Sequence, residues 1–258
     1  MTVLVLPRET FSSESKLAKI LDFLGWKISH DPDADSDLVI WHNDDVPVHI
    51  GIKGSPPIVN WRTKLIDKAR VNNVFENVFG YKIGVDPTTY HGLAVEKVLG
   101  HQQHGVVVTC PRHPNKERVY QKIITNHPDE TWLEEFRIDV YGSSLLITRK
   151  QLDKDPNGFP GSGRMSRSFL FDYPLIKLGS MFEIDLVCEF LKQIGMEYGS
   201  LDVLRGLDDR LYIIDATTNT ACPNPEWHGN VTEHQYIKRS AEYFKQAFSL
   251  KSNGFASR

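Results

Sequence analysis

The stretch from residue 199 to residue 219 constrains the chain more than any other part of its sequence. Apolar residues alternate with other residues in two short runs, and residues 206–210 between them favour a turn, so the pattern predicts a β-hairpin. Asp202 lies in the first predicted strand and Asp215 at the end of the second. Side chains at matched positions of a hairpin share a face and lie about 5 Å apart. Two carboxylates at that distance repel each other unless a cation lies between them or one of them is protonated. The hairpin is therefore a candidate Mg²⁺ site.

The composition is that of an ordinary globular protein. The 258 residues are enough for one large domain or two small ones, with 40% hydrophobic and 24% charged residues. A net charge of −3 gives no sign of a nucleic acid or membrane partner, and no apolar run approaches the ~20 residues of a membrane span. The three cysteines are odd in number and far apart, which argues against a disulfide framework and indicates a cytoplasmic protein.

Hydrophobic periodicity predicts an α/β (α+β) chain in two parts. Residues 1–58 alternate short apolar strands, one of them expected over 48–52, with an amphipathic helix, as in a small α/β lobe with some parallel pairing. The glycine and prolines of residues 54–57 mark a boundary, and residues 59–258 form the second part. In that part we expect helices over 64–78, 182–194 and 233–248, and strands over 93–98, 106–109, 119–124, 136–141 and 144–148.

From residue 67 onward, charged residues follow one another in a recognisable order. Asp67 and Lys68 open a helix that ends at Gly80, a strand then carries Lys97, and a later strand over 119–124 contains Gln121. Arg137 follows in the next long strand, before the paired acids of the hairpin. In this order and spacing, over the last three quarters of the chain, the sequence resembles the ATP-grasp superfamily, near amide ligases such as glutathione synthetase and D-alanine–D-alanine ligase.

This resemblance implies an ATP-grasp fold, preceded by a small α/β lobe, that binds ATP between two subdomains with Mg²⁺ as the metal. In the superfamily an Asn two residues after the second acid also binds the metal, and Thr217 stands at that position here. Residues 100–105 occupy the place of the loop that covers the phosphates. The implied nucleotide contacts are Lys68, Lys97, Tyr120, Gln121, Lys122 and Ile123; the implied metal ligands are Asp202, Asp215 and Asn219; the implied catalytic residues are Arg137, Lys150 and Arg167.

The resemblance implies an ATP-dependent carboxylate–amine ligase that works through an acyl phosphate, with small-molecule or peptide carboxylates and amines as substrates. It is also compatible with a homodimer. The residues leave alternatives open: a non-catalytic ATP-binding module or a kinase on the same fold, or a Mg²⁺-dependent nuclease that uses the two acids. For Asp202, the alternative to a metal ligand is an ordinary member of an ion pair.

Overall fold

The computed structural model describes residues 1–48, 50–99, 105–125, 132–154, 160–170, 181–220 and 232–249. The predicted phosphate-covering loop therefore lies outside the described residues, except for Gly105. The side chains of residues 150–154 and 160–170 also lie outside them, so Lys150 and Arg167 are placed by backbone register alone.

The N-terminal lobe is a parallel sheet crossed by one helix, as predicted. All four residues of β3 are buried, which is typical of a parallel strand covered on both faces. The side chain of Ser15 accepts a hydrogen bond from the Ala18 amide and so begins the helix. The strand order in the sheet is β2-β1-β3-β4. Along the chain the elements are β1 (Thr2–Leu6), the 3₁₀ turn η1 (Arg8–Thr10), helix α1 (Lys16–Phe23), β2 (Lys27–Ser29), β3 (Leu38–Trp41) and β4 (Ile58–Val59).

The strand predicted over residues 48–52 is wrong. None of the described residues in that stretch lies in a strand. Val46 and Val48 are 56% and 59% exposed, and Pro47 between them has no N–H to give to a sheet. The fourth strand of the lobe is β4 instead, which straddles the boundary predicted at residue 58.

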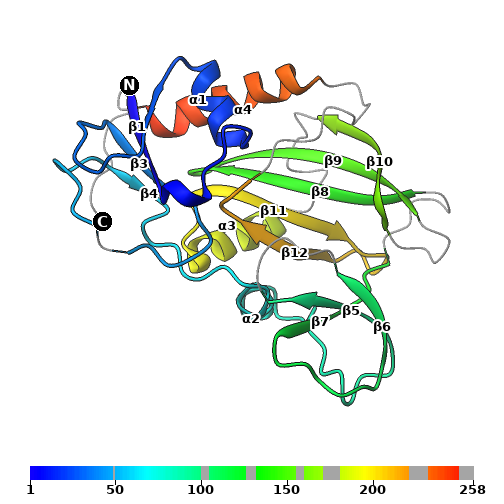
Figure 1. The fold of residues 1–258 in the computed structure, drawn as a ribbon. Coiled ribbons are helices and arrows are strands. Elements are labelled where there is room, and N and C mark those ends of the chain that lie inside the picture. Colours follow the sequence, from blue (N-terminus) through cyan, green and yellow to red (C-terminus); the bar gives the residue numbers. More distant parts are fainter. Residues whose placement is uncertain are drawn as a thin grey trace.

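A long antiparallel sheet forms the body of the second part. Its strand order is β10-β9-β8-β11-β12, and a separate sheet with the order β6-β5-β7 lies near α2 and the strand β12 (Figure 1). The hairpin predicted from the sequence is β11 and β12, which pair directly. The strands are β5 (Gly92–Val98), β6 (Val106–Cys110), β7 (Arg118–Lys122), β8 (Trp132–Tyr141), β9 (Ser144–Lys154), β10 (Pro160–Leu170), β11 (Tyr198–Arg205) and β12 (Leu211–Thr217).

Helices cover the two faces of the long sheet. Helices α2 (Lys68–Phe79) and α3 (Met181–Ile194) pack on one face through a core that includes Phe75, Phe190 and Leu201. Helix α4 (Glu233–Phe248) packs with α1 against the other face, in a core shared with the N-terminal lobe (Figure 1). Among the described residues, no helix has both the length and the apolar character needed to cross a membrane. Cys110 and Cys188 are free thiols.

Asn60 joins the two parts of the chain. Its Nδ2 donates to the carbonyls of Trp41 and Tyr198 at 3.1 and 2.9 Å, and its Oδ1 accepts from the amides of Glu197 and Tyr198 at 2.8 and 2.9 Å. Its backbone has φ of 63°, a left-handed conformation that Asn tolerates better than most residues. One buried amide therefore fixes the first lobe against the start of β11.

His42, directly after β3, makes the stability of the fold sensitive to mild acid. The ring is fully buried, and burial, followed by the charge of Lys16, lowers its pKa from 6.5 to about 4. Between these values the unfolded chain binds a proton that the folded chain does not, so stability falls as the pH falls. We expect the change from pH 7 to about pH 4.5 to cost about 2–3 kcal/mol through His42.

Urea unfolding of the His42→Leu variant at both pH values measures this contribution. The variant should lose less stability than the wild type between the two conditions, whatever its stability at pH 7. The exposed His91 provides a matched control, since His91→Leu makes the same chemical change outside the core. An unchanged pH dependence in His42→Leu would show that the ring does not titrate in this range.

Candidate functional site

The strand register aligns polar residues in one row across the long sheet. Arg137 on β8 pairs with Thr148 on one side and with Asp202 on the other, and Asp202 pairs in turn with Asp215. Paired residues of antiparallel strands point to the same face, so this row forms a continuous polar strip. A register shift follows Asp202, where the hairpin bends. The matched positions predicted for the two aspartates are confirmed.

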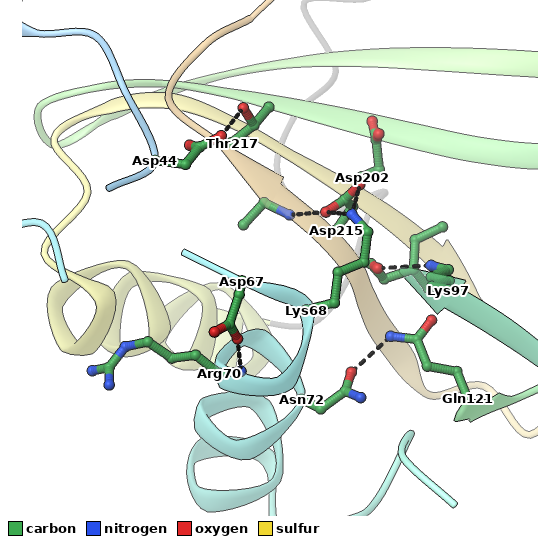
Figure 2. Close-up of polar contacts among 12 residues, drawn as sticks. Asp44, Asp67, Lys68, Arg70, Asn72, Lys97, Gln121, Asp202, Asp215 and Thr217 are labelled. Carbon is green, nitrogen blue, oxygen red and sulfur yellow. Dashed lines mark hydrogen bonds and ion pairs between the residues drawn. The ribbon is translucent and has the colours of Figure 1, made fainter. Parts of the chain in front are cut away.

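Each of these carboxylates is bound to a side-chain cation. Arg137 donates to Asp202 through two nitrogens, with Nε–Oδ1 of 2.9 Å and Nη2–Oδ2 of 3.1 Å. Lys68 donates its Nζ to both oxygens of Asp215 at 2.6 and 2.7 Å (Figure 2). The repulsion between the two acids is therefore offset by Arg137 from strand β8 and by Lys68 from helix α2.

Lys97 completes a group of three cations. Its Nζ donates to the carbonyl of Ile214, beside Asp215, at 3.0 Å (Figure 2). Burial lowers the pKa of Lys97, and the nearby carboxylate of Asp215 opposes that effect. Burial also disfavours the charge of Arg137, but the carboxylate of Asp202 outweighs it and raises the pKa of the guanidinium. The site thus holds partly desolvated positive charge, which an anionic ligand would stabilise.

Helix α2 places two of its residues in the site because of how it begins. Asp67 caps the helix by accepting from the Arg70 amide at 2.6 Å, so the helix begins at Lys68. This confirms the start at Asp67 and Lys68 on which the resemblance depends, whereas the start at residue 64 predicted from periodicity is wrong. One turn later, Asn72 accepts from Nε2 of the buried Gln121 at 2.7 Å (Figure 2). Lys68 and Asn72 are four residues apart and share a helix face. That spacing is the sequence signal by which Asn72 could have been found.

Four of the predicted nucleotide contacts, residues 120–123, lie on β7 and just beyond it. The carbonyl of Tyr120 accepts from the Val85 amide, and the amide of Lys122 donates to the Ile83 carbonyl, each at 2.9 Å. Nζ of Lys122 donates to the hydroxyl of Tyr212 at 3.1 Å, which ties β7 to the hairpin. Residues 83 and 85 of the chain thus occupy the hydrogen-bonding groups at the edge of β7 at Tyr120 and Lys122. Ile123 lies just beyond the end of the strand.

Asp44, which the sequence analysis missed, holds the end of β12 from the N-terminal lobe. It accepts from the Thr217 hydroxyl at 2.8 Å (Figure 2). It also accepts from the amide and hydroxyl of Thr218 at 2.5 and 3.1 Å. Asn219 donates its backbone amide to the Thr217 hydroxyl at 3.1 Å. Asp44 follows the carboxyl end of a parallel strand, a common location for functional side chains, and this was the available signal.

The other two predicted catalytic residues are located by strand register. Lys150 on β9 pairs with Glu135 on β8, two positions from Arg137, and with Ser168 on β10. Arg167 on β10 pairs with Gln151, in the row next to that of Lys150. Lys150 therefore lies on the strand next to β8 and Arg167 on the strand beyond it, and the catalytic roles of both stay predictions.

The donor set fits one magnesium ion that is brought in with a phosphate ligand. Mg²⁺ in proteins often takes one or two carboxylates and completes its shell with waters and substrate phosphates. Asp202 and Asp215, adjacent and partly exposed, match that requirement. Within the described part of the chain, no group of three or more His, Cys, Asp or Glu side chains could hold a metal without such help. The lysines and the arginine beside the acids suit phosphate oxygens.

Comparison with known proteins identifies the fold. No family model and no curated protein matches the sequence. Among solved structures, the ATP-grasp ligase PsnB complexed with a minimal precursor has a TM-score of 0.61 at 10% identity, over 96% of this chain and 99% of that chain. The macrocyclase MdnC bound with precursor peptide MdnA, from Microcystis aeruginosa MRC, has a TM-score of 0.55 at 14% identity, over 95% and 100%. D-cycloserine synthetase DcsG has a TM-score of 0.54 at 11% identity, over 95% and 99%. The chain has the ATP-grasp fold, as its sequence led us to expect.

Proposed function

We propose that the protein is an ATP-dependent ligase that joins the carboxylate of a small molecule or peptide to an amine through an acyl phosphate. The observation that carries this proposal is the convergence of Lys68, Lys97 and Arg137 on the paired acids Asp202 and Asp215. The ATP-grasp fold supports it, since ligases of this fold are among the similar structures. One of those structures contains a precursor peptide and another a minimal precursor, which favours a peptide as the acid or the amine.

Amide formation from a free carboxylate in water is unfavourable, and bound Mg-ATP supplies the phosphoryl group that activates the carboxylate. In our proposal Asp202 and Asp215 hold the magnesium ion, while Lys68 and Lys97 offset the phosphate charge as point cations. Arg137 is planar and always charged, so it can bind two oxygens of the transferring phosphoryl group. The contribution of the protein is positioning and electrostatic stabilisation.

One observation favours the alternative of a non-catalytic ATP-binding module. Thr217 offers a hydroxyl, a poorer metal ligand than an amide carbonyl, and that hydroxyl is bound to Asp44 at 2.8 Å. A site that relies on two acids would hold a second metal ion weakly. Binding of ATP without turnover is the expected behaviour of such a module.

ADP release measured with a panel of carboxylates, peptides and amines separates these functions. We expect ADP only when both an acid and an amine are present, together with a product that mass spectrometry shows to have lost one water. A phosphorylated product without an amide would identify a kinase. Tight ATP binding without ADP release over the whole panel would support the non-catalytic module, and cleavage of plasmid DNA with Mg²⁺ would indicate a nuclease.

A further inference from the structure

A groove lies on the outer side of α2. It has a volume of about 600 Å³, and its lining includes the cations Lys64 and Arg70, the acid Asp67, and the amides of Asn73, Asn77 and Gln193. Arg70 and Lys68 extend from different sides of α2, Arg70 away from the acid pair and Lys68 toward it (Figure 2). One helix therefore separates this groove from the candidate site.

Within the described residues, neither Lys64 nor Arg70 forms an ion pair, in contrast to Lys68 and Arg137. The neighbouring Asp67 uses Oδ1 to cap the helix. Nη2 of Arg70 makes a long contact of 3.5 Å with the Gln193 carbonyl, and its buried Nε has no acceptor among the described residues. A buried N–H without an acceptor is costly, and an anionic ligand would satisfy it.

The spacing of the lining residues fits an extended chain better than a small ion. Arg70, Asn73 and Asn77 follow one side of α2 at intervals of three and four residues, a span of about 10 Å at 1.5 Å per residue. Each amide side chain can donate and accept a hydrogen bond, as a peptide backbone requires. A small ion would use the cations alone and leave these amides without a role.

We infer that this groove binds a short peptide segment that carries acidic side chains, with its carboxylates at Lys64 and Arg70 and its backbone along Asn73 and Asn77. The inference rests on the proposed function, to which it adds a docking site for a peptide substrate. Because α2 is about 10 Å wide, a peptide held on its outer side stays close to the phosphate-binding face.

Fluorescence anisotropy in the absence of nucleotide tests this site. The probes are the labelled peptide Gly-Glu-Leu-Asp-Glu-Gly and its uncharged counterpart Gly-Gln-Leu-Asn-Gln-Gly. We expect the acidic probe to bind more tightly, and Lys64→Met combined with Arg70→Met to weaken it about tenfold or more. The matched control removes two lysines of α4, as Lys238→Met with Lys245→Met, and should leave its affinity unchanged.

Two results would overturn the inference: equal binding of the two probes, or an equal loss of affinity in the α4 control. A second variant guards against misfolding, because Asn73→Asp with Asn77→Asp changes only exposed positions of α2 and should repel the acidic probe. The outcome is independent of the ligase assay. Peptide binding without any ADP release would leave the groove established and the proposed reaction refuted.

Discussion

Replacing Asp215 with asparagine is expected to lower ADP release about 10²–10³-fold at saturating substrates, the usual cost of losing one preorganised electrostatic group. Among the described residues, Asp215 is the only carboxylate that both accepts hydrogen bonds from Lys68 and pairs with Asp202 across the hairpin. The amide keeps the shape but loses the charge, so it would hold magnesium poorly and leave Lys68 without its ion pair. The assay is ADP release with the acid and amine that the panel identifies.

The same chemical change elsewhere on the hairpin serves as the control. Asp209 lies in the turn with φ of 57°, its side chain is 96% exposed, and asparagine tolerates that conformation. Asp209→Asn should keep wild-type ADP release. A full rate in Asp215→Asn would show that the paired acids have no part in the reaction.

Removal of the carboxylate of Asp139 is expected to have the largest effect on stability. Lys16 donates its Nζ to Oδ1 at 2.6 Å, Tyr236 donates its hydroxyl to Oδ2 at 2.5 Å, and the charged pair is fully buried. The ammonium also lies over the rings of Tyr141 and Tyr198, 5.6 and 5.7 Å from their centroids. Asp139→Ala leaves this ammonium buried without its counter-ion, at a cost of about 3–5 kcal/mol in the free energy of unfolding.

Urea unfolding measures the loss, and a double variant tests its cause. Lys16→Met with Asp139→Leu removes both charges, so it should recover much of the stability that either single variant loses. The exposed pair Lys53–Asp35, at 2.9 Å, is the matched control, and Lys53→Met should leave the stability nearly unchanged. A loss below about 1 kcal/mol in Asp139→Ala would mean that the ion pair contributes little to the fold.

Local sequence rules predicted the hairpin well, because pairing across a short turn depends on nearby residues alone. The turn fixes the register as far as Val203 opposite Ile213, and that register alone would place Asp202 opposite Ile214. The register shift after Asp202 brings it opposite Asp215, and the alternation of apolar residues did not predict this shift. The end of α2 at Gly80, whose φ is 76°, follows from the freedom of glycine at that position. Periodicity placed the start of this helix too early because Leu65 and Ile66 are apolar, whereas the cap is Asp67, where the order of charged residues had placed it.

The partners of the charged residues could not be predicted, since they depend on tertiary packing. Lys68 and Asp215 are 147 residues apart, Asp44 and Thr217 are 173 apart, and Lys16 and Asp139 are 123 apart. Periodicity places each of these residues on one face of its own helix or strand. It does not indicate which other helix or strand packs against that face. The resemblance pointed to Lys68, Lys97 and Arg137. The contacts of Asp44 and Asn72 are visible only in the folded structure.

Isothermal titration calorimetry with a non-hydrolysable ATP analogue, in Mg²⁺ and in EDTA, tests the central claim most directly. The account predicts that Mg²⁺ strengthens binding to the wild-type protein, and that Asp202→Asn with Asp215→Asn removes this gain. An equal effect of Mg²⁺ on the two proteins, or the absence of any nucleotide binding to the wild type, would contradict it.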